Sequence, residues 1–174
     1  ADYFAEEVFT AETEESQNVL LRVSLLEPIE LGVCAQLWPQ FNCRKLLPTL
    51  ERRNVFVTAI SDEKGEEYRL HPLFQSFLRR RYIAEAGRSG VAAEFEKIAD
   101  FMLTRRTWEP GMRYLLHAEN YERAASVLVE RGSTMIEAGA LGVVASWLEA
   151  LPHSTLEQHP RLLRLRGEGT RLRG

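Results

Sequence analysis

The sequence contains few of the features that mark secreted or membrane proteins. Its 174 residues include two cysteines, Cys34 and Cys43, which are too few for a disulfide framework. They could form one disulfide, but a single pair in a chain of this size fits a reducing cytoplasm at least as well. No stretch approaches the ~18 apolar residues of a transmembrane helix, and the acidic N-terminal region lacks the basic start of a signal peptide. We therefore expect a cytoplasmic protein with no membrane partner.

Motifs for nucleotide and metal chemistry are also missing. A P-loop ends in Gly-Lys-Ser/Thr, and none of the three lysines follows a glycine. The segment His117-Ala118-Glu119 resembles the His-x-Glu of zinc deaminases, but no Pro-Cys-x-x-Cys follows it. Cys34 has no histidine near it in sequence and is expected to be a small buried hydrophobe rather than a nucleophile. We predict that the chain is not an enzyme and has no catalytic residue, metal or cofactor of its own.

The composition is that of an ordinary globular protein. Hydrophobic residues make up 45% of the chain and charged residues 27%, with a net charge of −3. This length suffices for one medium domain or two small ones, and the charge does not favour nucleic-acid binding by the chain as a whole. Both ends lie in helix-like sequence without obvious caps, which indicates a piece excised from a longer protein.

Residues 1–88 have the pattern of a small helical domain with one β-hairpin. Two helices are expected within residues 2–30, a third over about 30–37 and a fourth over about 42–53, with Asn42 as N-cap and Pro48 awkwardly inside. Residues 55–60 and 67–71 have strand-like patterns around a turn at 62–66. Pro72 begins the next helix, and Gly87 and Gly90 are expected to close this part of the chain. This order resembles a winged-helix domain.

Residues 89–174 show helical patterns only. Apolar residues recur at helical spacing in three stretches, which begin at Phe95, Tyr121 and Val144. Shorter helices are expected near residues 109–118 and 133–138. Helical hairpins with alanine at contact positions are typical of a tetratricopeptide-like α-solenoid, here truncated. The predicted fold class is therefore mainly α with one small β-hairpin: a winged-helix domain followed by α-helical hairpins.

Several segments resemble one family of regulators. Residues 68–74, Tyr-Arg-Leu-His-Pro-Leu-Phe, resemble the "Tyr-Arg-aromatic-His-x-Leu-Phe" signature of MalT-like regulators, the large ATP-binding members of the LuxR type within the STAND class of signalling ATPases. Residues 3–8, 46–57, 121–125 and 147–152 also resemble that family's segments, in the same order. The resemblance covers nearly the whole chain. It departs from the family pattern at Pro48, within a usual helix, and at Leu70, where the family often has an aromatic residue.

The resemblance implies that the chain is an internal regulatory fragment of a bacterial ATP-dependent transcription regulator. In such proteins a separate P-loop module binds ADP at rest and ATP when active, and the winged helix docks on that module and locks it. Tetratricopeptide-like helices sense an inducer or a regulatory protein, and a C-terminal helix-turn-helix binds promoter DNA. ATP or ADP would be a cofactor of the full-length protein only. The alternative is a free-standing protein-interaction or adaptor module.

His71 is the candidate site residue. It lies on the polar side of its strand and precedes Pro72, near a helix start where free backbone amides and the helix dipole attract anions. The resemblance implies that His71 contacts the ADP phosphate in the locked state. The alternative, which remains open, is a capping histidine that only stabilises the turn.

Direct DNA binding is the least favoured function. The helix that would read DNA carries four basic residues, Arg44, Lys45, Arg52 and Arg53. The wing, however, has a net charge of −3 from Asp62, Glu63, Lys64, Glu66 and Glu67. Because phosphate neutralisation dominates affinity for DNA, this acidic wing opposes binding. We predict no direct nucleic-acid contact by this chain.

Overall fold

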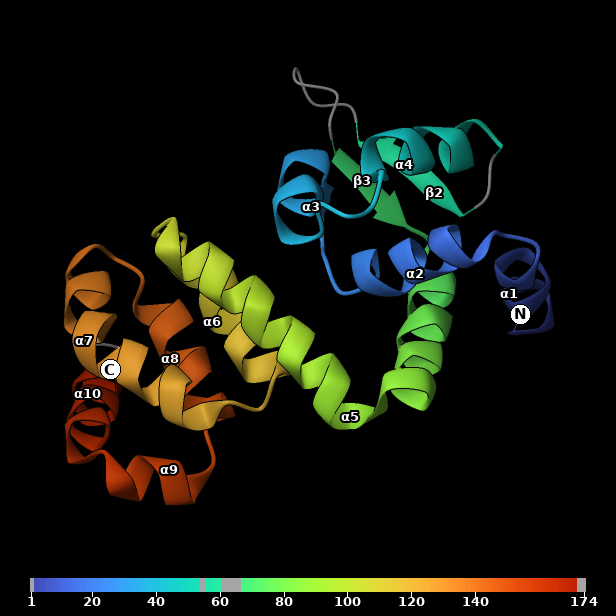
Figure 1. Cartoon of the computed structure of the whole chain (residues 1–174). Coiled ribbons are helices and arrows are strands. Elements are labelled where there is room, and N and C mark those ends of the chain that lie inside the picture. Colours follow the sequence, from blue (N-terminus) through green and yellow to red (C-terminus); the bar gives the residue numbers. More distant parts are fainter. Residues whose placement is uncertain (1, 54–55, 61–66, 172–174) are drawn as a thin grey trace. The chain divides into compact units, whose positions relative to one another are not determined.

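The chain forms two compact units, Ala1–Val91 and Ala92–Gly174. The computed structural model describes residues 2–53, 56–60 and 67–171 (Figure 1). Both units are mainly helical, and the strands belong to the first. The predicted fold class is confirmed, because helices and a small antiparallel sheet are followed by helices alone.

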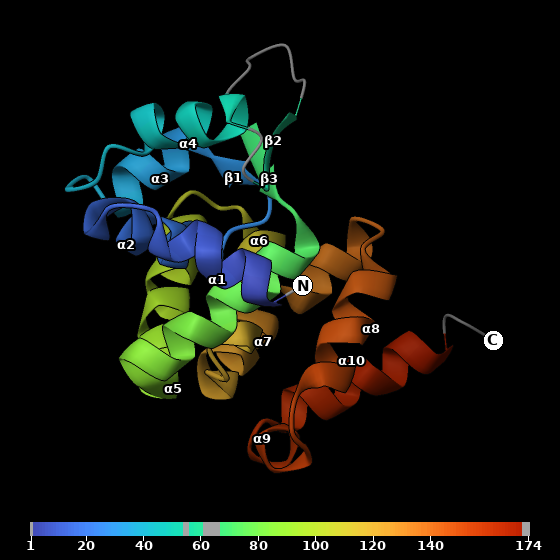
Figure 2. The same cartoon turned by 90° about the vertical axis from the view of Figure 1, so that its right-hand side faces the viewer.

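The first unit begins with four short helices. They are α1 (Asp2–Thr10), α2 (Glu14–Val23), α3 (Leu31–Leu37) and α4 (Cys43–Arg52). The Asn42 side chain accepts a hydrogen bond of 3.1 Å from the Lys45 N–H, which confirms the predicted N-cap. Pro48 lies inside α4 without ending it. In both cartoon views α4 packs along the sheet (Figures 1 and 2).

The sheet has three strands, so the prediction of a single hairpin is incomplete. Strands β2 (Val57–Ile60) and β3 (Glu67–Leu70) form the predicted antiparallel hairpin. A third strand, β1 (Ile29–Glu30), pairs with β3 on its other side, giving the order β1-β3-β2. A strand of two residues is too short to show an alternating pattern of apolar and polar side chains, so this strand could not be predicted. Glu30 belongs to β1, and α3 starts one residue later than expected.

The start of the hairpin also differs from the prediction. Residues 54–55 and the turn and wing residues at 61–66 lie outside the described part of the chain. Phe56 has a φ of 53°, a left-handed conformation that cannot continue a strand, so β2 begins at Val57. The predicted strand over 55–60 is therefore confirmed only in its last four residues.

Helix α5 (Pro72–Thr104) starts at the predicted proline and consists of two helical segments that meet at a kink at Gly87. Gly87 has a φ of 73° and a ψ of 166°, a conformation that suits glycine, and it introduces a kink. The helix then resumes through Gly90 and continues to Thr104. The helical segment that starts at Pro72 is thus interrupted at Gly87, close to where the first unit ends at Val91, although a second helical segment follows directly.

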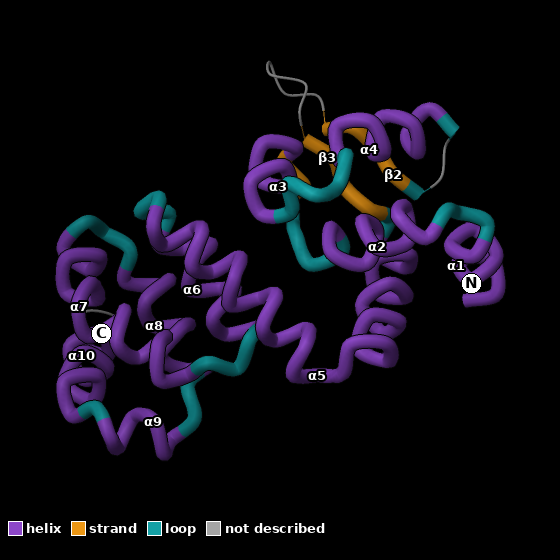
Figure 3. The backbone as a smooth tube through the Cα atoms, viewed as in Figure 1, coloured by secondary structure: helices purple, strands orange, loops and turns teal. Residues whose placement is uncertain are grey.

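The second unit contains five further helices within its described residues (Figure 3). They are α6 (Trp108–His117), α7 (Tyr121–Glu137), α8 (Leu141–Ala150), α9 (His153–Gln158) and α10 (Pro160–Arg171). Residues 133–137 are helical as predicted, but they form the end of α7, which continues through Gly132, and not a separate helix. That glycine is buried where α7 meets Leu165 of α10: a Cβ there would lie 2.5 Å from a Leu165 methyl carbon. The tetratricopeptide-like character remains a prediction.

Candidate docking and phosphate-contact site

Phe56 lies at the centre of an aromatic cluster in the first unit. Its ring stacks on Phe74 of α5 with a centroid distance of 5.0 Å and meets Phe4 of α1 edge-on at 5.7 Å. Its carbonyl accepts a 2.8 Å hydrogen bond from the His71 N–H, and the two rings are 6.0 Å apart. A non-glycine residue at positive φ costs about 1–3 kcal/mol and persists where its surroundings hold it in place. Here contacts with Phe4 of α1, Phe74 of α5 and His71, which lies between β3 and α5, hold Phe56.

His71 is exposed and caps α5. Its Nδ1 accepts a hydrogen bond of 3.3 Å from the Leu73 N–H, so the capping interaction considered above is present. A neutral ring that accepts at Nδ1 carries its proton on Nε2. Nε2 can therefore donate a hydrogen bond to another molecule while the cap stays intact. The capping role and a phosphate contact use different nitrogens and are compatible.

Two exposed apolar residues, Phe4 and Leu73, are linked to this histidine through Phe56 and through the cap. Phe4 and Leu73 are each 59% exposed, although large apolar side chains usually gain by burial. Within α1 it is Ala5 and Phe9 that are buried, whereas Phe4 is not. Phe4 contacts Phe56, and Leu73 is joined to His71 by the cap. We call Phe4, Phe56, His71 and Leu73 the docking face.

A hollow of about 480 Å³ adjoins the docking face on the hairpin. The residues that line it on the exposed side of the hairpin include Thr58, Arg69 and His71. Strand β3 alternates, with Tyr68 and Leu70 buried and Arg69 exposed. His71 was singled out from the sequence, whereas Phe56 and Arg69 were not. The alternation of residues 68–71, Tyr-Arg-Leu-His, could have indicated Arg69, because it puts Arg69 and His71 on the same face of the strand.

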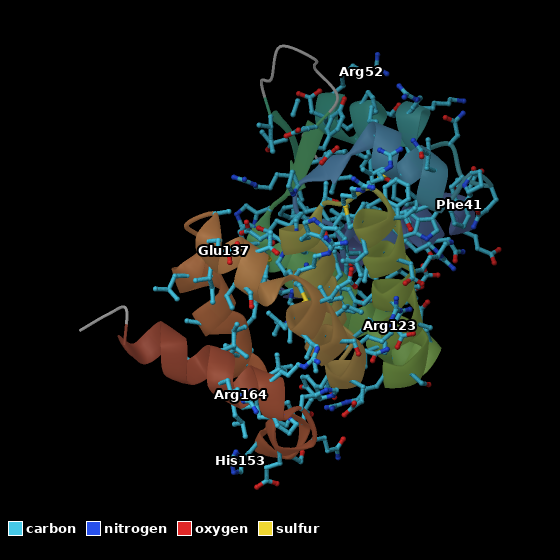
Figure 4. All side chains as sticks on the ribbon, turned by 90° about the vertical axis from the view of Figure 1, so that its left-hand side faces the viewer. Phe41, Arg52, Arg123, Glu137, His153 and Arg164 are labelled. Atoms are coloured by element: carbon cyan, nitrogen blue, oxygen red, sulfur yellow. The ribbon has the colours of Figure 1, made fainter. Side chains whose placement is uncertain are left out.

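The basic residues of α4 and its C-cap Arg53 do not form an isolated positive surface. Arg44, Lys45, Arg52 and Arg53 are all exposed, and Figure 4 shows Arg52 at the periphery of the first unit. Arg53, however, forms a 2.8 Å ion pair with Glu12. Lys45 shares a hollow of about 270 Å³ with Glu12 and Glu15. These carboxylates would meet DNA phosphates together with the basic side chains, which opposes binding.

We therefore expect the 174-residue chain to show no sequence-specific DNA binding. The measurement is a gel shift at physiological salt with excess competitor DNA, in which no shifted band should persist. The chain with Arg44→Ala and Lys45→Ala serves as the matched control. A band that survives competition and disappears in this double variant would contradict the prediction.

The two cysteines are free and buried. The pKa of the Cys34 thiol is raised well above its usual range, first because it donates a hydrogen bond to the Cys43 sulfur and second because it is buried. The same hydrogen bond lowers the pKa of Cys43. Cys34 is thus a protonated, buried side chain, as predicted, and not an activated nucleophile.

The other histidines lie in the second unit and take part in separate contacts. His117 stacks on Phe95 at 5.2 Å, and His159 lies 3.1 Å from a Glu122 oxygen. His153 is exposed on α9, 3.3 Å from Glu157 (Figure 4). Within residues 2–53, 56–60 and 67–171, no three histidine, cysteine or acidic side chains are grouped to hold a metal ion.

None of the helices in the described ranges combines the length and apolar character needed to cross a membrane.

The helices of the first unit, with an antiparallel hairpin and a short third strand, define a winged-helix domain. Residues 5–89 match the family model of the MalT winged helix domain.

The similarity to curated proteins extends beyond the winged helix. The chain is 29% identical over 169 residues to the HTH-type transcriptional regulator MalT of Klebsiella pneumoniae, which covers 95% of this chain. It is 27% identical over 166 residues to MalT of Yersinia enterocolitica and 26% identical over 162 residues to MalT of Serratia proteamaculans. Each alignment covers 93% of this chain. The chain spans 18% of the length of each of these relatives.

Proposed function

We propose that this chain is the winged-helix and first sensor-side portion of a MalT-like, ATP-dependent transcription regulator of the STAND class. Its docking face packs against a nucleotide-binding module elsewhere in the same protein and holds that module in the ADP-bound, inactive state. The helices of the second unit begin a tetratricopeptide-like region that receives the inducer or a regulatory protein. The similarity to MalT regulators over nearly the whole chain supports this proposal.

The placement of His71 carries the proposal. The ring is exposed and its Nδ1 is occupied by the cap, so Nε2–H remains as a donor. A phosphate oxygen is an acceptor that suits such a donor, and a hydrogen bond to a charged group is worth about 1.5–3 kcal/mol. The residues present therefore fit a nucleotide phosphate. ADP, when bound to its own module, would supply the anion, and this chain would supply the contact that keeps the module closed.

The docking face supplies the apolar part of the interaction. Burying an exposed apolar side chain at an interface is favourable by roughly 25 cal/mol per Å² of area removed from water. Such a contact exists only in the docked state, so it stabilises that state alone. An adaptor module would use the same surface, but its binding would not depend on nucleotide. Nucleotide dependence therefore separates the two functions.

A substitution on the docking face tests the proposal. In the full-length regulator, Leu73→Ser should weaken ADP retention about five-fold, because about 1 kcal/mol of apolar burial is lost on docking. Serine is tolerated in the first turn of a helix, so α5 should remain folded. The measurement is the rate of release of a fluorescent ADP analogue.

Ile83→Ser is the matched control, since Ile83 is a 41% exposed apolar residue further along α5 and does not belong to the docking face. Equal release rates for Leu73→Ser, Ile83→Ser and the unaltered regulator would argue against docking through this face.

A further inference from the structure

We propose that Arg69 is a second phosphate-binding side chain and that, together with His71, it forms a site for a diphosphate group on the exposed face of the hairpin. This inference rests on the proposed function, because it extends the contact assigned to His71. The ligand chemistry is a diphosphate, which ADP or free pyrophosphate would present.

The backbone places Arg69 and His71 on one side of the chain. Residues two apart in a strand project from the same face, and the buried pair Tyr68 and Leu70 takes the opposite face. The strand pairing sets Thr58 directly across from Arg69. One step further along, the His71 N–H donates to the Phe56 carbonyl and continues the ladder. Arg69, His71 and the Thr58 hydroxyl thus line the same hollow of about 480 Å³.

The Arg69 side chain forms no hydrogen bond or ion pair within the part of the chain that the structure describes. Other arginines of the chain are paired with carboxylates: Arg53 with Glu12, and Arg81 with Glu6 and Glu85. Glu67 projects from the same face of β3 as Arg69, but the two form no ion pair. The Arg69 guanidinium is therefore available to an anion from outside.

The donors in this hollow match a diphosphate. A guanidinium binds phosphate through two parallel N–H donors and remains charged at any physiological pH. His71 adds a neutral N–H donor, and the Thr58 hydroxyl can also donate. A diphosphate carries oxygens on two phosphorus atoms, so Arg69 and His71 can each take one phosphoryl group. A single phosphate has its oxygens on one phosphorus atom. It is therefore less suited to bind both Arg69 and His71, which are two residues apart.

The first experiment uses the 174-residue chain and needs no nucleotide-binding module. Inorganic pyrophosphate is titrated while the arginine Nε–H signals and the histidine ring signals are followed by NMR. We expect saturable shifts at Arg69 and His71, weaker shifts with inorganic phosphate, and loss of the His71 shift in Arg69→Gln. Arg88, which is also exposed in the first unit, is the control position. The inference is overturned if the Arg69 signal moves no more than that of Arg88.

The second experiment measures ADP affinity in the full-length regulator. We expect Arg69→Gln to weaken ADP binding about ten-fold, Arg69→Lys to weaken it less, and Arg88→Gln to leave it unchanged. A smaller effect on AMP than on ADP would support the diphosphate assignment, and equal effects would overturn it. If His71→Ser weakens ADP binding and Arg69→Gln does not, only the present inference fails. If neither does, the proposed function fails as well. Retention of charge in Arg69→Lys keeps the test valid if the glutamine variant folds poorly.

Discussion

Phe74→Ala is expected to lower the free energy of unfolding of the first unit by about 3–5 kcal/mol, the usual loss for a large aromatic side chain removed from a core. Phe74 is fully buried and stacks on Phe56 at 5.0 Å and on Phe77 at 6.2 Å. Its removal leaves a cavity and also takes away the ring that supports Phe56 at positive φ. Since domains are stable by only about 5–15 kcal/mol, this loss brings the unit close to unfolding.

The measurement is urea unfolding of the 174-residue chain, followed by circular dichroism. The neighbouring Leu73→Ala is the matched control, because Leu73 is 59% exposed and exposed substitutions usually change stability by less than about 0.5 kcal/mol. The two substitutions therefore distinguish a side chain that stabilises the core, Phe74, from one that is exposed and free to contact another surface, Leu73. Equal losses of stability would show that Leu73 is a core residue and that the docking face is wrongly assigned.

The sequence was sufficient to predict the features that depend on local chemistry. The Asn42 cap, the start of α5 at Pro72 and the hairpin of β2 and β3 follow from caps, proline and alternation, which act over a few residues. The position of His71 at a helix start followed for the same reason. These features need no knowledge of what packs against them.

Features that depend on tertiary contacts could not be predicted. Strand β1 exists because Ile29 pairs with Tyr68 of β3, a partner far away in sequence. Phe56 takes a left-handed conformation because the rings of Phe4, His71 and Phe74 hold it, although its own sequence neighbourhood favours a strand. Helix α7 continues through Gly132 because the missing side chain lets Leu165 approach. In each case a distant residue overrides the local preference.

The same distinction applies to the candidate site. The sequence indicated His71, but the absence of a partner for the Arg69 side chain within the described residues became visible only in three dimensions. The structure was also needed to assign the two ring nitrogens of His71, because Nδ1 accepts from the Leu73 N–H and only Nε2 remains for another molecule. A substitution that removes both functions of His71 therefore has to be compared with one that removes a single function.

His71→Ala removes the cap and the proposed phosphate contact, whereas His71→Ser removes the contact alone. Serine is a favourable N-cap, but its side chain is too short to reach a ligand beyond the helix end. In the isolated chain, His71→Ala should cost about 1 kcal/mol of stability and His71→Ser much less. This difference is measured by thermal or urea unfolding and establishes that the serine variant is well folded.

In the full-length regulator, both variants should bind ADP about 10- to 100-fold more weakly and should raise transcription in the absence of inducer. A hydrogen bond to a charged phosphate is worth about 1.5–3 kcal/mol, and each 1.4 kcal/mol is a factor of ten. Because this contact exists only in the closed, ADP-bound state, its loss shifts the population toward the open, active state by the same factor. The measurements are ADP affinity and uninduced reporter expression. If His71→Ser restores both to the unaltered values while His71→Ala does not, the histidine acts only as a cap and contributes nothing to nucleotide retention. If a well-folded His71→Ser variant loses ADP and activates transcription as His71→Ala does, Nε2 is the atom that keeps the regulator closed.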